Sequence, residues 1–151
     1  MINIQIVPQY EKLVQASLLD EAALATLNEA KNTLNVELTI AIDTDDTLQQ
    51  LNHQFLGVNF PTDVLSFPAD EFDPDGQIQY IGDVIISYPR AQQQAAKAGH
   101  TVNAEIQLLV VHGVLHLLGY DHQEILEKKR MWTVQESILN RLECNLNQHP
   151  D

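Results

Sequence analysis

Three of the six histidines in the sequence fall in one short window, at spacings that suit a metal site. His112 and His116 are four residues apart, and on a helix such residues lie one turn apart on the same face. Gly119 permits the left-handed turn that commonly ends a helix, so the chain can double back and present His122. Three neutral imidazoles leave a fourth zinc position open, which is typical of catalytic zinc sites. The sequence therefore predicts one Zn²⁺ per chain, held by His112, His116 and His122.

A purely structural role for these histidines is the alternative. A single histidine on an apolar helix is commonly a hydrogen-bonded core residue, but two of them without an adjacent acidic partner are costly to bury. The same ligand offsets occur in metzincin proteases, where a glutamate after the first histidine is the general base. Gly113 occupies that position here, so peptide hydrolysis by that mechanism is not expected. The sequence does not assign the catalytic residues.

Hydrophobic periodicity indicates which elements must position the histidines. Alternating residues predict four strands, and helical spacing with capping signals predicts five helices. The expected strands cover 2–7, 36–42, 64–67 and 78–87, and the expected helices cover 10–34, 44–55, 89–99, 103–118 and 123–146. The first helix is either continuous or broken near 17–20. An acidic turn region is expected at 68–77. With no internal repeat and no linker, residues 1–151 are expected to form a single α+β domain.

Composition restricts the partners of this domain. The chain carries 8 Lys and Arg against 21 Asp and Glu, a net charge of −13, which argues against non-specific nucleic-acid binding and gives no reason to expect DNA as a partner. Most of the excess lies in residues 1–75, with 2 basic and 13 acidic residues, so an RNA substrate near the histidines is less strongly opposed. Cys144 is the only cysteine. Without a signal-peptide pattern or a bilayer-length apolar run, we expect a soluble, cytoplasmic protein with no membrane association.

Four segments together point to a known family. They are His112-Gly-Val-Leu-His-Leu-Leu-Gly-Tyr-Asp-His122, Pro61-Thr-Asp-Val-Leu-Ser-Phe67, Ile81-Gly-Asp-Val84, and Gly99-His100 followed by Glu105. In these segments the chain resembles the YbeY family of bacterial metal-dependent endoribonucleases. The resemblance is good over residues 51–123, and the order of the N-terminal elements agrees with it.

The resemblance implies a fold, a chemistry and a partner. The fold would be zincin-like, with a mixed four-stranded sheet surrounded by helices, and the three histidines would be the zinc ligands. The function would be single-strand-specific, zinc-dependent RNA cleavage in the maturation of the 16S rRNA 3′ end and in ribosome quality control. The expected partners are therefore single-stranded RNA and the small ribosomal subunit.

Leu56 departs from the family pattern. Family members typically carry an arginine near the metal at this point, and leucine cannot stabilise phosphate charge as a bidentate donor. This departure keeps a second reading open, a catalytically weak, ribosome-associated zinc protein. A metallopeptidase is a third reading, which Gly113 disfavours.

Several other polar residues near the histidines admit two interpretations each. Asp83 either orients a ligand histidine or satisfies backbone amides. Glu105 shares the helix face of His112 and either supports that ligand or is a solvated acid in the first turn. Asp121 is either a base or a turn residue. Lys128-Lys129-Arg130 either meets phosphate or forms a charged helix face.

Overall fold

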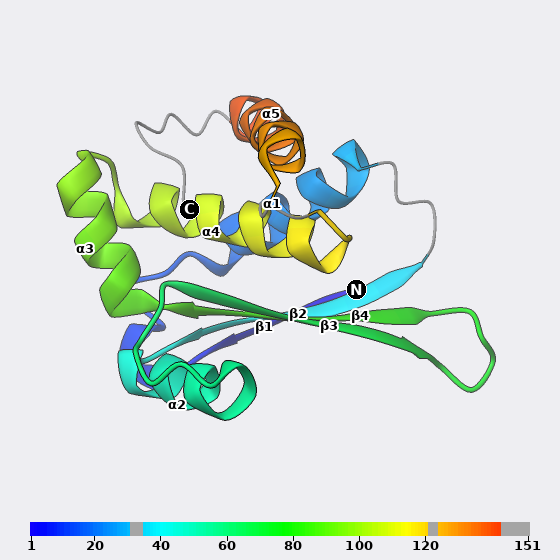
Figure 1. The fold of residues 1–151 in the computed structure, drawn as a ribbon, viewed down its shortest axis with the longest axis horizontal. Coiled ribbons are helices and arrows are strands. Elements are labelled where there is room, and N and C mark those ends of the chain that lie inside the picture. Colours follow the sequence, from blue (N-terminus) through cyan, green and yellow to red (C-terminus); the bar gives the residue numbers. More distant parts are fainter. Residues whose placement is uncertain (31–34, 121–123, 143–151) are drawn as a thin grey trace.

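The computed structural model places four strands in one mixed sheet (Figure 1). It describes residues 1–30, 35–120 and 124–142. The strand order is β1-β2-β4-β3, in which β1, β2 and β4 run parallel and β3 is an antiparallel edge strand against β4. The strands are β1 (Ile2–Ile6), β2 (Val36–Asp43), β3 (Val64–Phe72) and β4 (Gln79–Ser87).

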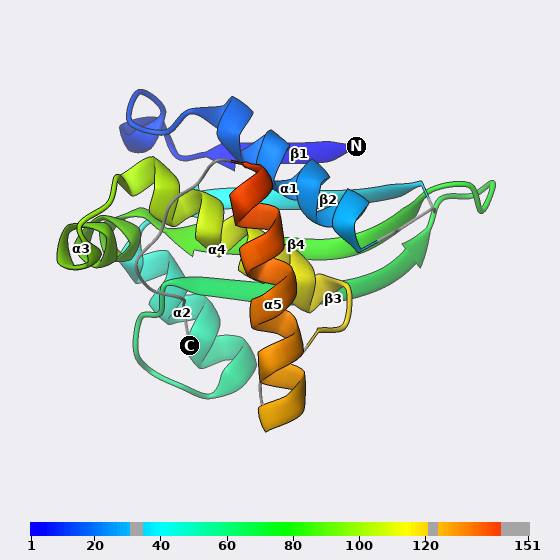
Figure 2. The same cartoon turned by 90° about the horizontal axis from the view of Figure 1, so that it is seen from above.

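Helices cover the two faces of the sheet unequally (Figures 1 and 2). On one face α1 and α4 pack side by side, and α5 lies across them as an outer layer. The opposite face carries α2, and α3 stands at one end of the sheet. The helices are α1 (Ala16–Glu29), α2 (Asp45–Leu56), α3 (Tyr88–Ala98), α4 (Val102–Leu117) and α5 (Ile125–Arg141), with a short 3₁₀ helix at Pro8–Tyr10.

Helix α4 is the centre of the core. Twelve of its 16 residues are buried, because it contacts the sheet, α1, α3 and α5 at the same time. A helix enclosed on every side needs apolar residues all round, and α4 has them, for example Leu108, Leu109 and Val111, each at most 1% exposed. The two helical histidines therefore lie on the least exposed helix among the described elements.

A glycine brings α4 unusually close to the sheet. A Cβ atom added at Gly113 would lie 2.5 Å from Cγ1 of Val84 on β4, well inside van der Waals contact. At the same place Ser66 of β3 donates its hydroxyl to the Gly113 carbonyl oxygen at 3.1 Å. The crossing of α4 over the β3–β4 pair thus depends on the missing side chain at position 113.

The sequence predicted the architecture and several helix ends. The α+β class with a mixed four-stranded sheet is confirmed. Thr44 caps α2 as expected, because its hydroxyl accepts a hydrogen bond from the Thr47 amide at 3.2 Å. Ser87 caps α3 in the same way, and Pro89 lies in its first turn.

Two expected boundaries were wrong. The helix expected over 10–34 begins only at Ala16 and ends at Glu29, since residues 8–10 form a separate 3₁₀ turn; residues 31–34 lie outside the described part. Strand β3 continues to Phe72, into the region expected to be an acidic turn. It continues because Glu71 and Phe72 pair with β4 beyond an irregularity at Pro68, a long-range contact that the local sequence pattern does not display.

Within the described residues, none of the helices has both the length and the apolar character needed to cross a bilayer.

Candidate metal centre

Helix α4 brings His112 and His116 together as the spacing predicts. Their Nε2 atoms lie 3.2 Å apart, and the ring planes meet at 78° with centroids separated by 4.7 Å. Two imidazole nitrogens on a tetrahedral zinc, each about 2.0–2.1 Å from the ion, are about 3.3 Å apart. The observed separation therefore fits a shared zinc ion between these two nitrogens.

The end of α4 turns at Gly119, where the sequence predicts a left-handed conformation. Gly119 has a φ of +98°, its amide donates to the His116 carbonyl at 3.0 Å, and the Tyr120 amide donates to the Leu115 carbonyl at 3.0 Å. These paired hydrogen bonds form a Schellman motif, so the left-handed turn expected at Gly119 is confirmed. His122 itself lies outside the described residues, as do Asp121 and Cys144. Within the described part of the chain, no further His, Cys, Asp or Glu completes a three-ligand group with the two helical histidines.

His112 is held from a neighbouring helix by a residue that the sequence analysis missed. Its side chain is buried, 3% exposed, and its Nδ1 lies 3.1 Å from Oε1 of Gln135, a fully buried residue of α5. The signal was present in the sequence: Gln135 is a polar residue between Met131 and Ile138, on a stripe whose other members are apolar and buried. His116, in contrast, is only half-buried.

Asp83 does not orient a ligand histidine, and that interpretation is wrong. Val84 faces α4 at Gly113, and successive strand residues point to opposite faces, so Asp83 lies on the face away from the histidines. There it accepts a hydrogen bond from the Tyr80 hydroxyl. Burial, together with this hydrogen bond to Asp83, raises the pKa of Tyr80.

Both interpretations of Glu105 are also wrong. The side chain is neither solvated nor bonded to His112; it is 4% exposed and pairs with His100, with 2.7 Å between His100 Nε2 and Glu105 Oε1. Burial raises the pKa of Glu105, and the His100 hydrogen bond opposes part of that rise. The His100 Nδ1 atom is buried without a hydrogen-bond partner among the described residues. This buried pair fixes the corner between α3 and α4.

Leu56 ends α2 on the side of the sheet where β3 forms the edge. It is 61% exposed, and the neighbouring Phe55 ring packs against Phe67 of β3 with centroids 5.2 Å apart. Figure 2 shows that this end of α2 and the beginning of α5 both extend past the β3 edge, and Figure 1 shows that they do so from opposite faces. Position 56 therefore lies at the end of α2 that extends past the β3 edge.

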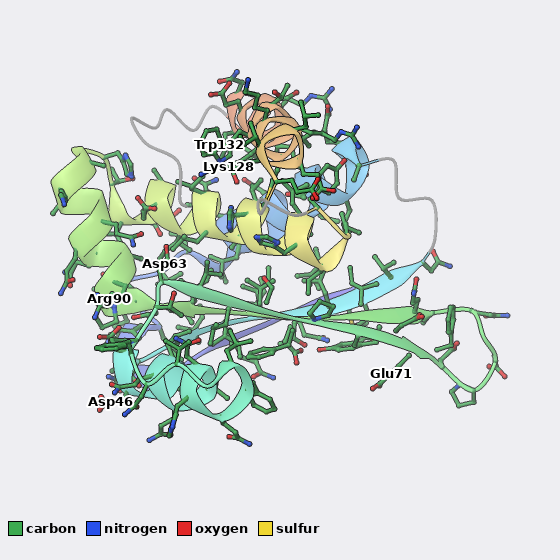
Figure 3. The ribbon with its side chains drawn as sticks, viewed as in Figure 1. Asp46, Asp63, Glu71, Arg90, Lys128 and Trp132 are labelled. Atoms are coloured by element: carbon green, nitrogen blue, oxygen red, sulfur yellow. The ribbon has the colours of Figure 1, made fainter. Side chains whose placement is uncertain are left out.

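Three of the eight Lys and Arg residues have partners among the described residues. Arg90 bonds Asp45 at 3.1 Å at the far end of α2 (Figure 3), and Arg141 bonds Glu29 at 2.7 Å. Lys128 lies over the Trp132 ring of α5 at 4.7 Å from the centroid, which is a cation–π contact. Lys129 and Arg130 are exposed on the first turns of α5, the helix that follows the histidine segment.

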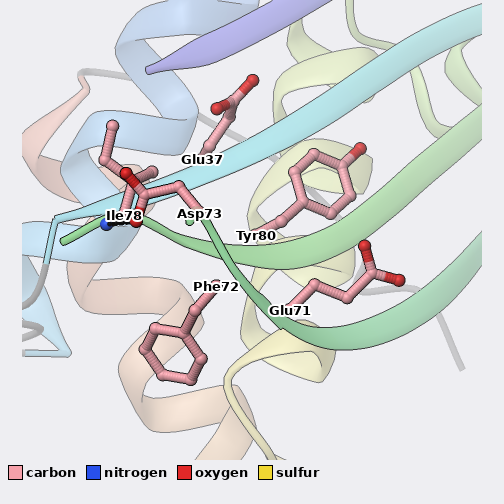
Figure 4. Close-up of a pocket in the computed structure, with 6 residues that line it drawn as sticks. All are labelled: Glu37, Glu71, Phe72, Asp73, Ile78 and Tyr80. Atoms are coloured by element: carbon pink, nitrogen blue, oxygen red, sulfur yellow. Dashed lines mark hydrogen bonds between the residues drawn. The ribbon is translucent and has the colours of Figure 1, made fainter. Parts of the chain in front are cut away.

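A hollow lies away from the histidines, where the β3–β4 hairpin meets β2 (Figure 4). It encloses about 250 Å³ and is lined by Glu37, Glu71, Phe72, Asp73, Ile78 and Tyr80. The Asp73 carboxylate accepts hydrogen bonds from the Gln77 and Ile78 amides at 2.6 and 2.9 Å. That carboxylate therefore builds the hairpin turn.

Comparison with known proteins agrees with this architecture. The family profile described as Endoribonuclease YbeY matches residues 3–143. The chain is 41% identical over 147 residues to the Endoribonuclease YbeY of Roseiflexus castenholzii, covering 94% of this chain and 92% of the relative. It is 46% identical over 134 residues to that of Chloroflexus aurantiacus, covering 84% and 86%. The solution structure of TM1509 from Thermotoga maritima superposes with a TM-score of 0.60 at 25% identity, covering 100% of this chain and 97% of that one.

The fold is thus a small α+β fold, shared with the solved TM1509 structure over 100% of this chain and 97% of that one, and its central helix carries two histidines here. The chain belongs to the YbeY endoribonuclease family.

Proposed function

We propose that this protein is a single-strand-specific, zinc-dependent endoribonuclease that acts in the cytoplasm, in 16S rRNA 3′-end maturation and ribosome quality control. Its partners would be single-stranded RNA and the small ribosomal subunit. The observation that carries the proposal is the 3.2 Å separation of the His112 and His116 Nε2 atoms, in a chain that belongs to a family of endoribonucleases.

The chemistry follows from the donor set. His112 and His116, with His122 as third ligand, would hold one Zn²⁺ and leave one coordination position open. When bound, zinc supplies a Lewis acid that polarises a phosphoryl oxygen and makes water a better nucleophile near neutral pH. The protein's own part is to hold two imidazoles in fixed rotamers on a buried helix, so that little reorganisation is needed.

Charge near the proposed site is sparse. No Lys or Arg occurs between Lys31 and Arg90, so α2 and strands β2, β3 and β4 carry no cation at all. Lys128, Lys129 and Arg130 begin α5, directly after the histidine segment, and we expect the phosphate contacts to come mainly from them. This supports a substrate bound by few phosphates, as expected for a short single-stranded segment.

The test combines metal analysis with cleavage. Protein purified without chelator should carry about one zinc per chain, and His116→Ala should lose most of it. The same preparation should cleave a single-stranded RNA but not its duplex, and chelation should abolish the cleavage. A wild type that contains no divalent metal, or RNA cleavage that persists in chelator and in His116→Ala, would refute the proposal.

Leu56 favours one second candidate, a ribosome-associated zinc protein with weak or lost cleavage. That protein would bind zinc and the small subunit but would cleave RNA no faster than the His116→Ala variant. A peptidase is disfavoured further by the structure, because position 113 faces Val84 and has no room for a glutamate. Chelator-sensitive digestion of an unstructured protein substrate would support the peptidase instead.

A further inference from the structure

We propose that Gln135 is a positioning residue for the metal centre, which fixes the tautomer and the ring orientation of His112. This inference rests on the proposed function, since it assigns a role toward the same zinc ion. It concerns a residue on α5, a helix that supplies none of the three predicted ligands.

The hydrogen-bond geometry determines which nitrogen of His112 carries the proton. The Gln135 Oε1 atom can only accept, so the His112 Nδ1 atom at 3.1 Å must be the donor. In a neutral imidazole the other nitrogen, Nε2, then keeps its lone pair. Nε2 is also the atom that faces His116 at 3.2 Å. The hydrogen bond between Gln135 and His112 therefore leaves the Nε2 lone pair of His112 directed toward His116, where a shared metal ion would bind.

Burial makes this hydrogen bond hard to replace. Gln135 is 0% exposed and His112 is 3% exposed, so water has little access to either group. A buried N–H that loses its acceptor is costly, and the alternative tautomer avoids that cost by moving the proton to Nε2. That tautomer cannot ligate zinc through Nε2. The Gln135 amide oxygen thus disfavours the His112 tautomer that cannot ligate zinc through Nε2.

The choice of an amide also sets the charge at the site. Metal-bound histidines commonly donate to a carboxylate, which raises ligand basicity and strengthens metal binding. A neutral glutamine orients the ring without adding a negative charge, so the bound ion retains more of its positive charge for the substrate. Gln135→Glu should accordingly bind zinc more tightly than the wild type.

The experiment compares Gln135→Leu and Gln135→Glu with the wild type in two measurements. The first is the tautomer of His112 in metal-free protein, read from ¹H–¹⁵N couplings of the imidazole ring. The wild type should show Nδ1–H, and Gln135→Leu should shift His112 toward Nε2–H. The second is zinc affinity by competition with a chelating dye, which Gln135→Leu should lower by about 10–100-fold and Gln135→Glu should preserve or raise.

A matched control separates positioning from general loss of packing. Ile138→Val removes one methylene from a buried residue one turn along the same helix. It should lower stability without changing the tautomer or the zinc affinity. An unchanged His112 tautomer in Gln135→Leu, or equal zinc affinities for Gln135→Leu and Ile138→Val, would overturn the inference. A wild type that binds no zinc would defeat the proposed function instead, and the tautomers in metal-free protein would still decide the role of Gln135.

Discussion

Leu56 exposes 61% of its surface at the end of α2, where a longer side chain would extend into solvent without a clash. An apolar residue at such a position contributes little to folding, so its replacement isolates effects on catalysis. The resemblance noted in the sequence implies an arginine at this position, and Lys129 and Arg130 are exposed on a different helix, α5. The position therefore offers the most direct test of how phosphate charge is stabilised.

We predict that Leu56→Arg raises the rate of single-stranded RNA cleavage. One charged donor to a developing oxyanion is typically worth about 2.7–4 kcal/mol, a factor of about 10²–10³ in rate. Leu56→Lys should give a smaller gain, because an ammonium cannot form the paired hydrogen bonds of a guanidinium. The gain should vanish in Leu56→Arg combined with His112→Ala. A fast wild type that Leu56→Arg leaves unchanged would show that Lys128, Lys129 or Arg130 already fills the role.

The buried carboxyl of Glu105 leads to a prediction about how the stability of the protein depends on pH. Burial raises its pKa in the fold above the usual value of 4.5, so the fold favours the neutral carboxyl. The stabilising contribution of the neutral form is present below pH 4.5 and is lost as the pH rises through the raised pKa. A glutamine at this position does not titrate and can still accept the His100 hydrogen bond. The stability of Glu105→Gln relative to wild type should therefore increase with pH above 4.5.

Denaturant titrations from about pH 4 to about pH 8 measure this difference, since they begin below the usual pKa of the carboxyl and continue above it. Glu11→Gln, a change at an exposed carboxylate, controls for the loss of one negative charge from an acidic protein. A difference between Glu105→Gln and wild type that stays constant over this range would contradict the prediction.

Among the elements, α4 shows what local sequence can and cannot reveal. Its histidine spacing and the turn at Gly119 are both local signals, and each is matched by the structure. Its partners are not local. Gln135 is 23 residues from His112, so their contact depends on how α5 packs across α4. The hydrophobic periodicity of α5 indicates that Gln135 lies on its buried face, but it does not indicate which residue Gln135 contacts.

The strands show the same limit. Alternation identified β2 and β4 correctly, because one face of each is buried. Alternation did not reveal which face of β4 meets α4. The interpretation in which Asp83 orients a ligand histidine therefore placed it on the wrong side of the sheet. The extension of β3 to Phe72 was not predicted either, because acidic residues at a sheet edge resemble a turn until their pairing with β4 is known.

The crossing of α4 over the sheet predicts a compensating pair of substitutions. Gly113→Ala forces a methyl group toward Val84 Cγ1, at 2.5 Å, and should destabilise the protein by about 1–3 kcal/mol through overpacking. Val84→Ala creates space at the same contact. The double variant should lose less stability than the two single variants lose together, and the coupling free energy should be about 0.5–3 kcal/mol. Denaturant unfolding of the four proteins measures it, and strictly additive losses would contradict the crossing geometry.

The distribution of charge over the molecule bears on how RNA is held. The chain has a net charge of −13, and the described cations near the beginning of α5 number three. An overall negative protein gains little long-range attraction for RNA, so binding must depend on few close contacts. This mode of binding differs from that of nucleases that bind a duplex through a broad basic surface.

The salt dependence of binding should therefore be shallow. With at most three phosphates neutralised, the slope of log K against log salt concentration should be about −2 for a single strand. Anisotropy titrations with a 2′-O-methyl RNA, which resists cleavage, measure it directly. Lys129→Gln should reduce the slope by about 0.7 units. A slope steeper than about −5 would reveal a larger phosphate-binding surface than the described cations provide.

The burial of α4 has a consequence for how the protein meets its metal in the cell. Many small zinc proteins fold only when the ion arrives, because the ion substitutes for a core. Here the two helical histidines are brought together by the packing of a core helix between the sheet, α1 and α5. We therefore expect that the proposed metal would be lost and regained without unfolding, through the half-buried His116 side of the pair. A protein built in this way would persist intact through zinc scarcity as a reserve of inactive enzyme and would resume work when the supply returns.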